Sequence, residues 1–198
     1  MEEKVLMLHE IEEKYEIRKK FTGPLLVDTN PNYLSTLALL FAFASGYAFY
    51  RNMGVLGGIF VLANGYLDLL DGEVAKEFGR ATKFGDFIDH TFDRIADVAI
   101  LVGISMGPVV PLWLGGVTIL TVLLVSYMGT QHQAISQERL YAGIFGRSDR
   151  IAAIFVMGIA SYFFAEALFY GMWLILVLSA VTFLQRLWKS ASRIRKLP

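Results

Sequence analysis

The stretch "YLDLLDGEVAKEFGRATKFGDFIDHTFDRIAD", residues 66–97, places six aspartates inside an otherwise apolar part of the chain. An apolar run from position 54 leads into Asp68 and Asp71, and a second apolar run, "VAILVGISMG", follows Asp97 directly. Carboxylates next to apolar helices are costly unless something neutralises them. The stretch therefore predicts a polar site built into apolar helices.

The composition is that of a membrane protein. The chain has 198 residues, of which 55% are hydrophobic, no cysteine, and a mean hydropathy of +0.51. Soluble domains contain about 45–50% apolar residues. The 18 basic residues balance the 18 acidic ones, so no nucleic-acid partner is indicated. Without cysteine, disulfides and thiolate metal sites are excluded.

Six apolar stretches are long enough, or nearly so, to cross a bilayer. They cover residues 32–50, 54–75, 85–107, 112–130, 151–168 and 171–188. We expect an all-α membrane protein in which residues 31–198 form a six-helix transmembrane catalytic domain. "NPN" at 30–32 is expected to cap the first span, and the charged N-terminus argues against a signal peptide.

Residues 1–30 form a predicted juxtamembrane segment. Val5, Leu8, Ile11 and Tyr15 recur at helical spacing, and basic residues from Lys14 to Lys20 lie toward the end of the segment. This pattern is typical of an amphipathic helix on the membrane interface, in contact with anionic headgroups. A solvated cytoplasmic helix packed on the domain fits the many Glu residues equally well.

The positive-inside rule orients the spans. If the N-terminus is cytoplasmic, the 18 Lys and Arg lie in cytoplasmic segments except Arg51, which lies outside, and Arg94, which lies within a span. We therefore expect a multi-pass protein of the cytoplasmic membrane, with both termini and the aspartate site on the cytoplasmic side.

The aspartates are spaced so that four of them can meet. Asp68 and Asp71 share one helix face at i,i+3, and Asp89 and Asp93 share another at i,i+4. Because the two helices are consecutive, both pairs lie near the cytoplasmic end and can face one another. Hard oxygen ligands suit Mg²⁺, Mn²⁺ or Ca²⁺, and four carboxylates could hold two such ions as a clamp for phosphoryl groups.

Three small residues accompany the aspartates: Gly72, Ala75 and Gly85. Glycine within a helix costs about 1 kcal/mol relative to alanine. Small residues in register with carboxylates indicate close approach of a ligand to the backbone. Helix–helix packing is the alternative for each glycine alone.

The pattern D68-x2-D71-G72-x2-A75-K76-x8-G85-x3-D89-x3-D93 is similar to the signature of the CDP-alcohol phosphotransferase family, whose members make phospholipids in membranes. Seven of its eight positions match, and the eighth, usually Arg, is Lys76. The resemblance implies a transferase that moves a phosphatidyl-type group from a CDP-linked lipid to an alcohol, releases CMP and acts as a homodimer.

The resemblance also implies residue roles. Asp68, Asp71 and Asp89 would ligate two divalent ions, Mg²⁺ or Mn²⁺, and Asp93 would complete the metal site and serve as the catalytic base. The residues that would contact the CDP-linked donor are Gly72, Ala75, Lys76 and Gly85. A lysine offers a point charge where arginine offers a bidentate fork.

A second basic site indicates the acceptor. Arg147 and Arg150 lie three residues apart at the expected start of a helix, an arrangement suited to a phosphate. Together with "FDRIAD" at 92–97, this spacing resembles the inositol-phosphate-using branch, so the implied acceptor is inositol 1-phosphate. Simple positive-inside anchoring would also explain both arginines.

The segment "YMGTQHQ" (127–133) lacks the basic residues usual in that branch. Glycerol phosphate as acceptor, or a CDP-inositol donor used to build di-inositol phosphate, therefore remains open. His132 could contact an acceptor, although a lone loop histidine is more often solvated.

Two other classes of protein compete with a transferase. An ion- or proton-coupled transporter would spread its carboxylates through the depth of the bilayer. A non-catalytic scaffold would pair Arg94 with Asp97 and leave the glycine register unexplained. Asp86 and Asp97 do not match the signature, and we expect them to be solvated or paired with arginine.

Overall fold

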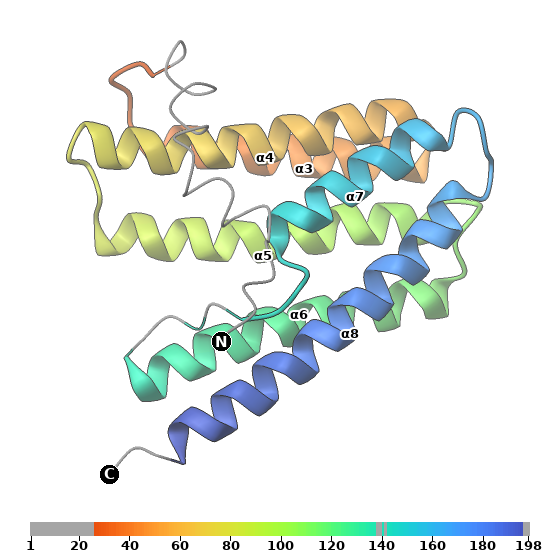
Figure 1. Ribbon diagram of the computed structural model, residues 1–198. Helices are drawn as coiled ribbons and strands as arrows, with labels where there is room; N and C mark the ends of the chain where they lie inside the picture. Colours follow the sequence, from red (N-terminus) through yellow and green to blue (C-terminus); the bar gives the residue numbers. More distant parts are fainter. Residues whose placement is uncertain (1–25, 138–139, 141, 196–198) are drawn as a thin grey trace.

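The computed structural model describes residues 26–137, 140 and 142–195. This part of the chain contains α-helices and no strand, as Figure 1 shows. The helices are α3 (Pro31–Tyr50), α4 (Gly54–Glu77), α5 (Lys83–Met106), α6 (Leu112–Ser136), α7 (Arg147–Ala160) and α8 (Ala167–Ile194). The helix predicted within residues 1–30 lies almost entirely outside the described residues.

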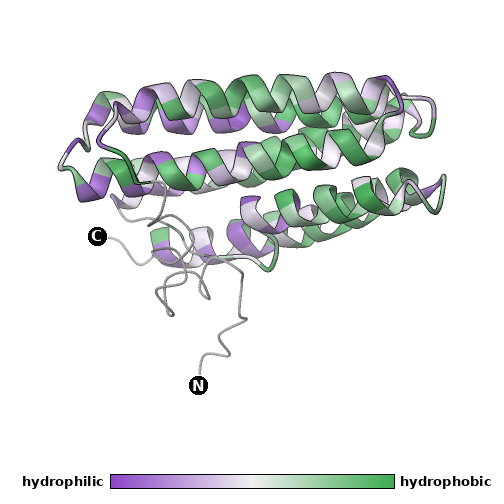
Figure 2. Cartoon of the chain, turned by 90° about the horizontal axis from the view of Figure 1, so that it is seen from above, coloured by the Kyte–Doolittle hydropathy of each residue, from purple (hydrophilic) through white to green (hydrophobic). Residues whose placement is uncertain are grey.

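The helices form one bundle with a polar end. α3 packs on α4 and α5, α7 packs on α4, and α6 packs on both α5 and α8. Hydrophilic residues gather toward the end of the bundle where α4 ends and α5 begins, and hydrophobic residues fill the rest of these helices (Figure 2). The acidic ends of α4 and α5 therefore lie side by side at one rim.

Local sequence signals fix the helix ends at this rim. The Asn30 side chain accepts a hydrogen bond from Asn32 N at 3.1 Å, and Pro31 occupies the first turn of α3, which confirms the predicted cap. Thr82 caps α5 in the same way, accepting from Gly85 N at 3.0 Å. Gly79, with φ of +61°, makes the tight reversal between α4 and α5.

Four of the described helices, α3, α4, α6 and α8, are long and apolar enough to cross a membrane. α5 is long enough but carries the charged residues of the site in its first half. α7 has only 14 residues, about 21 Å at 1.5 Å per residue, against a hydrocarbon core of about 30 Å.

Helix α7, the fifth of the described helices, differs from the predicted stretch 151–168. It starts earlier, at Arg147, and ends at Ala160, where amides of the following turn bond back to Met157, Ile159 and Ala160. The aromatic residues of this turn are apolar and exposed, Phe163 to 83%. The hydrophobic run in the sequence therefore extends beyond the end of the helix into an apolar turn, which is why the predicted end was too late.

Several glycines serve helix packing. A Cβ added to Gly103 of α5 would collide with the backbone of Gly46 in α3. A Cβ on Gly58 of α4 would lie 3.1 Å from the carbonyl oxygen of Phe155 in α7. These close crossings hold α3, α4, α5 and α7 together behind the rim.

Candidate active site

Three carboxylates converge between α4 and α5. Oxygen atoms of Asp68, Asp71 and Asp89 all lie within 4.8 Å of one another. The i,i+3 spacing aims the first two from α4, and the first turns of α5 supply the third. Such an all-carboxylate donor set fits a hard divalent cation, so the prediction that these side chains meet is confirmed by the geometry.

Ser35 of α3 supports this cluster, and the sequence analysis missed it. Its hydroxyl donates to Asp71 Oδ2 at 2.5 Å, and it also approaches the carbonyl oxygen of Pro31 at 3.2 Å. Asp71 is only 4% exposed. The one available signal was the position of Ser35 in the first turns after the "NPN" cap.

Asp93 lies one turn beyond Asp89 on α5, and a carboxylate oxygen of each lies within 4.8 Å of a ring nitrogen of His90. Arg147, the first residue of α7, reaches in between: its Nη1 lies 2.5 Å from Asp68 Oδ2 and 3.1 Å from Asp93 Oδ1. The guanidinium thus balances part of the negative charge of the cluster. Arg147 was expected at a separate phosphate site, and the structure instead places it at the junction of that site with the carboxylates.

Of the three small residues of the signature, Gly72 borders open space. A Cβ on Gly72 would meet no described atom within 4 Å, so packing against another described element does not explain this glycine. A Cβ on Gly85 would approach only the cap side chain of Thr82 and Asn32 Oδ1. Ala75 is partly buried on the same helix as Gly72. The open backbone at Gly72 leaves room for a ligand next to Asp71.

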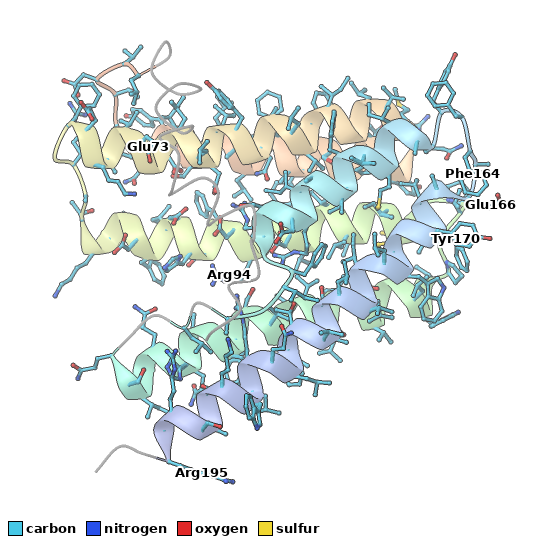
Figure 3. The ribbon with its side chains drawn as sticks, viewed as in Figure 1. Glu73, Arg94, Phe164, Glu166, Tyr170 and Arg195 are labelled. Carbon is cyan, nitrogen blue, oxygen red and sulfur yellow. The ribbon has the colours of Figure 1, made fainter. Side chains whose placement is uncertain are left out.

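Lys76 points away into solvent. Its side chain is 70% exposed, with Nζ 4.0 Å from Glu73 Oε1. Glu73 lies on the last turns of α4 near the rim (Figure 3). A long, exposed side chain at this place can reach toward a ligand beside Gly72.

A cavity of about 280 Å³ adjoins the carboxylates on the side of α6 and α8. Four arginines line it: Arg94 from α5, Arg147 and Arg150 from α7, and Arg186 from α8. Arg94 extends into the space between α5 and α6 in Figure 3. Asp93 and Asp97 belong to the same wall, so the cavity joins a cationic chamber to the carboxylate cluster.

Arg150 is held inside this wall. It is 3% exposed, and its Nη2 donates to Asp97 Oδ2 at 2.5 Å. The prediction that Asp97 pairs with an arginine is confirmed, and its close partner is Arg150. Arg94 instead lies near Asp93, with its Nη1 3.6 Å from the Asp93 carboxylate. The buried Nε atoms of Arg147 and Arg150 have no hydrogen-bond acceptor among the described residues.

Arg186 supplies the charge that "YMGTQHQ" lacks. Its Nη1 donates to Val125 O of α6 at 2.8 Å, and its Nε donates to Ala142 O at 2.9 Å. A Cβ on Gly129 would lie 3.2 Å from Nη1. Sequence patterns place Arg186 only among the basic residues of the predicted cytoplasmic segments, because the contact between α6 and α8 that brings it to the cavity is not visible in the sequence.

His132 neither faces the solvent nor lines this cavity. It lies within α6, is 1% exposed, and its Nδ1 pairs with Ser190 Oγ of α8 at 2.7 Å. The suggestion of a loop histidine in contact with an acceptor is therefore wrong, because α6 continues to Ser136 and turns this side chain toward α8. Asp86 is exposed in the first turn of α5, as expected.

Known proteins with similar sequences point to the same kind of site. The family model of the CDP-alcohol phosphatidyltransferases matches residues 28–184. An archaetidylinositol phosphate synthase of Pyrococcus horikoshii is 35% identical over 164 residues, which cover 83% of this chain and 85% of that protein.

Solved structures lead to the same family. The phosphatidylinositol phosphate synthase of Mycobacterium tuberculosis with CDP-DAG bound superposes with a TM-score of 0.75 at 27% identity, covering 87% of this chain and 92% of that one. The same enzyme in complex with manganese and citrate also gives a TM-score of 0.75, at 28% identity and 88% coverage of both chains. The chain belongs to the CDP-alcohol phosphatidyltransferase family and is a membrane transferase of phospholipid biosynthesis.

Proposed function

We propose that this transferase moves a phosphatidyl-type group from a CDP-linked lipid to inositol 1-phosphate and releases CMP. The observation that carries the choice of a phosphorylated acceptor is the four-arginine cavity whose wall includes Asp93, and the similarity to an archaetidylinositol phosphate synthase supports inositol 1-phosphate over glycerol phosphate. An acceptor that already carries a phosphate needs such a chamber, whereas a neutral alcohol does not.

The donor binds at the rim beside Gly72. Asp68, Asp71, Asp89 and Asp93 hold two divalent cations, Mg²⁺ or Mn²⁺, which when bound neutralise the pyrophosphate and activate its phosphorus. Support comes from the oxygen atoms of Asp68, Asp71 and Asp89 gathered within 4.8 Å and from the relative whose structure contains manganese. Gly72, Ala75 and Gly85 admit the cytidine and pyrophosphate close to the backbone, and Lys76 approaches a donor phosphate.

The acceptor phosphate binds in the cavity. Arg147 and Arg150 line the cavity and offer it the positive charge of their guanidinium groups, and Arg186 adds charge from α8. The first turn of α7, which starts at Arg147, adds backbone N–H groups that favour an anion. This site presents the inositol ring toward Asp93.

The chemical step is a displacement at phosphorus. A hydroxyl oxygen of the acceptor attacks the phosphorus that carries the lipid, and the bond from that phosphorus to CMP breaks. CMP leaves with the electron pair, and the hydroxyl proton passes to the carboxylate of Asp93. Arg147, 3.1 Å from Asp93 Oδ1, holds that carboxylate at the junction of the donor and acceptor sites.

The membrane arrangement follows from the same assignment. The helices α3, α4, α5, α6 and α8 span the cytoplasmic membrane, and α7, about 21 Å long, spans it together with the apolar turn that follows Ala160. The polar rim, both termini and the active site lie on the cytoplasmic side. Residues 31–198 form the catalytic domain, and the protein acts as a homodimer. The amphipathic juxtamembrane helix in residues 1–30 stays a prediction from the sequence. The second half of α5 is apolar, which supports counting α5 among the six spans. Only its first half, at the cytoplasmic end, faces the site.

Acceptor choice is tested by CMP release. Purified protein is incubated with Mg²⁺, a labelled CDP-linked lipid, and inositol 1-phosphate, glycerol phosphate or inositol in separate reactions. A further reaction offers CDP-inositol as donor. We expect CMP release to be fastest with inositol 1-phosphate and to be lost in Asp93→Asn. Faster release with glycerol phosphate, or from CDP-inositol, would replace the proposed substrates, and no release in any reaction would contradict the proposed transfer.

A further inference from the structure

Asn64 is a buried polar residue of α4 that the reaction scheme does not use. It is 1% exposed, and its Nδ2 donates to Ala38 O of α3 at 2.9 Å. Its Oδ1 is buried and has no hydrogen-bond partner among the described residues. Because a buried amide oxygen without a partner is costly, this atom calls for one.

The position of Asn64 connects it to the carboxylate cluster. It precedes Asp68 by one helical turn, so both side chains lie on the same face of α4. Both also line a narrow cavity of about 10 Å³ beneath the cluster. The other polar residues in its wall are Ser35, Asp89, Asp93 and Arg147.

This cavity has the size and polarity for one water molecule. A volume of about 10 Å³ is near the least that admits a single water. Buried waters persist where they find two to four polar partners, and the wall provides carboxylates, a guanidinium and the amide oxygen. One hydrogen of the amide nitrogen is donated to Ala38 O, and the amide oxygen of Asn64, which has no partner among the described residues, is available to such a water.

We propose that Asn64 is a positioning residue of the carboxylate site: its Oδ1 accepts a hydrogen bond from one buried water, whose second hydrogen is donated to the carboxylate of Asp68. The water holds the carboxylate of Asp68 in one orientation. The side of the carboxylate that does not bind the water then faces Asp71 and Asp89. Groups that orient carboxylate ligands in this way tune cation affinity. The inference rests on the proposed function only in taking the cluster to bind a divalent cation.

The test measures Mn²⁺ binding without donor or acceptor, by the electron paramagnetic resonance signal of free Mn²⁺. Asn64→Leu keeps the branched shape of the side chain and removes both the amide oxygen and the Nδ2 hydrogen bond to Ala38 O. We expect its Kd for Mn²⁺ to rise by about 10- to 100-fold, and a higher Mn²⁺ concentration to restore much of its turnover.

Ser45→Ala is the matched control. Ser45 is fully buried in α3, and its Oγ donates to Gly57 O of α4 at 2.9 Å. This variant therefore also loses a buried hydrogen bond between α3 and α4, but it lies away from the carboxylates. We expect its Kd for Mn²⁺ to stay within about twofold of the wild type, since the orienting effect on ligands is local.

Each outcome has a separate meaning. A folded Asn64→Leu protein with wild-type Mn²⁺ affinity overturns the inference and leaves the proposed function intact. Wild-type protein that binds no Mn²⁺ contradicts the proposed metal site instead. If Asn64→Leu does not fold, a crystal structure of the Mn²⁺-loaded wild type decides: a water in hydrogen-bond contact with both Asn64 Oδ1 and Asp68 supports the inference, and its absence overturns it.

Discussion

Gly72→Ala separates a ligand role for this glycine from a packing role. In the structure a Cβ at this position meets no described atom within 4 Å, and residue 72 lies inside α4 rather than at its end. The new methyl group therefore meets no steric obstacle from the described residues. Replacing a helical glycine by alanine then stabilises the fold by about 0.8–1 kcal/mol, which for a chain of this size corresponds to a Tm increase of about 2–4 °C.

The same methyl group lies in the space assigned to the donor. If the pyrophosphate approaches the backbone at Gly72, the methyl group displaces it from Asp71 and the bound cations. Displacement by about 1 Å can cost about 100-fold in rate, so we expect kcat/KM for the CDP-linked lipid to fall by at least about tenfold. The KM for the acceptor should stay near its wild-type value.

The assay combines thermal unfolding of the detergent-solubilised protein with steady-state CMP release at varied donor concentration. Gly103→Ala is the control, because its Cβ would collide with the backbone of Gly46; it should destabilise the fold by about 1–3 kcal/mol. A more stable Gly72→Ala protein with unchanged donor kinetics would refute the assignment of the donor to this face. A less stable one would return Gly72 to helix packing.

Three further predictions concern the charged residues. Asp93→Asn should lower kcat by at least about 100-fold, as expected for loss of a general base, while donor affinity measured by equilibrium binding changes little; equal loss of both would contradict its role as base. Arg186→Gln should raise the acceptor KM about tenfold through loss of a charged contact and leave the donor KM unchanged; an unchanged acceptor KM would make Arg186 a structural anchor. Asp97→Asn breaks a buried ion pair with Arg150, and thermal unfolding should show the fold destabilised by about 3 kcal/mol. The control Asp86→Asn changes an exposed residue and should stay within about 0.5 kcal/mol of the wild type. Similar stabilities of the two variants would show that the ion pair contributes little.

The carboxylate site could be predicted because it follows from helix periodicity. Asp68 and Asp71, and again Asp89 and Asp93, share a face whatever the tertiary structure, and the short connection between α4 and α5 brings the two faces together. The caps at Asn30 and Thr82 are likewise local signals. Such features need no knowledge of distant parts of the chain.

The cationic side of the site depends on contacts that no local pattern encodes. Arg186 reaches the cavity only because α8 packs on α6, and Arg147 reaches Asp68 only because α7 packs on α4. The end of α7 was misplaced because apolar aromatic residues follow Ala160 in a turn. Composition alone does not distinguish such a turn from a further stretch of helix.

The most direct test of the proposed transfer is the mass of its lipid product. The wild-type protein is incubated with a CDP-linked lipid, inositol 1-phosphate and Mg²⁺, and the lipids are analysed by mass spectrometry while CMP is counted. We predict one lipid carrying inositol and two phosphates for each CMP released, and neither product when EDTA removes the cation. CMP released without that lipid, or at the same rate with EDTA, would contradict metal-dependent transfer to inositol 1-phosphate.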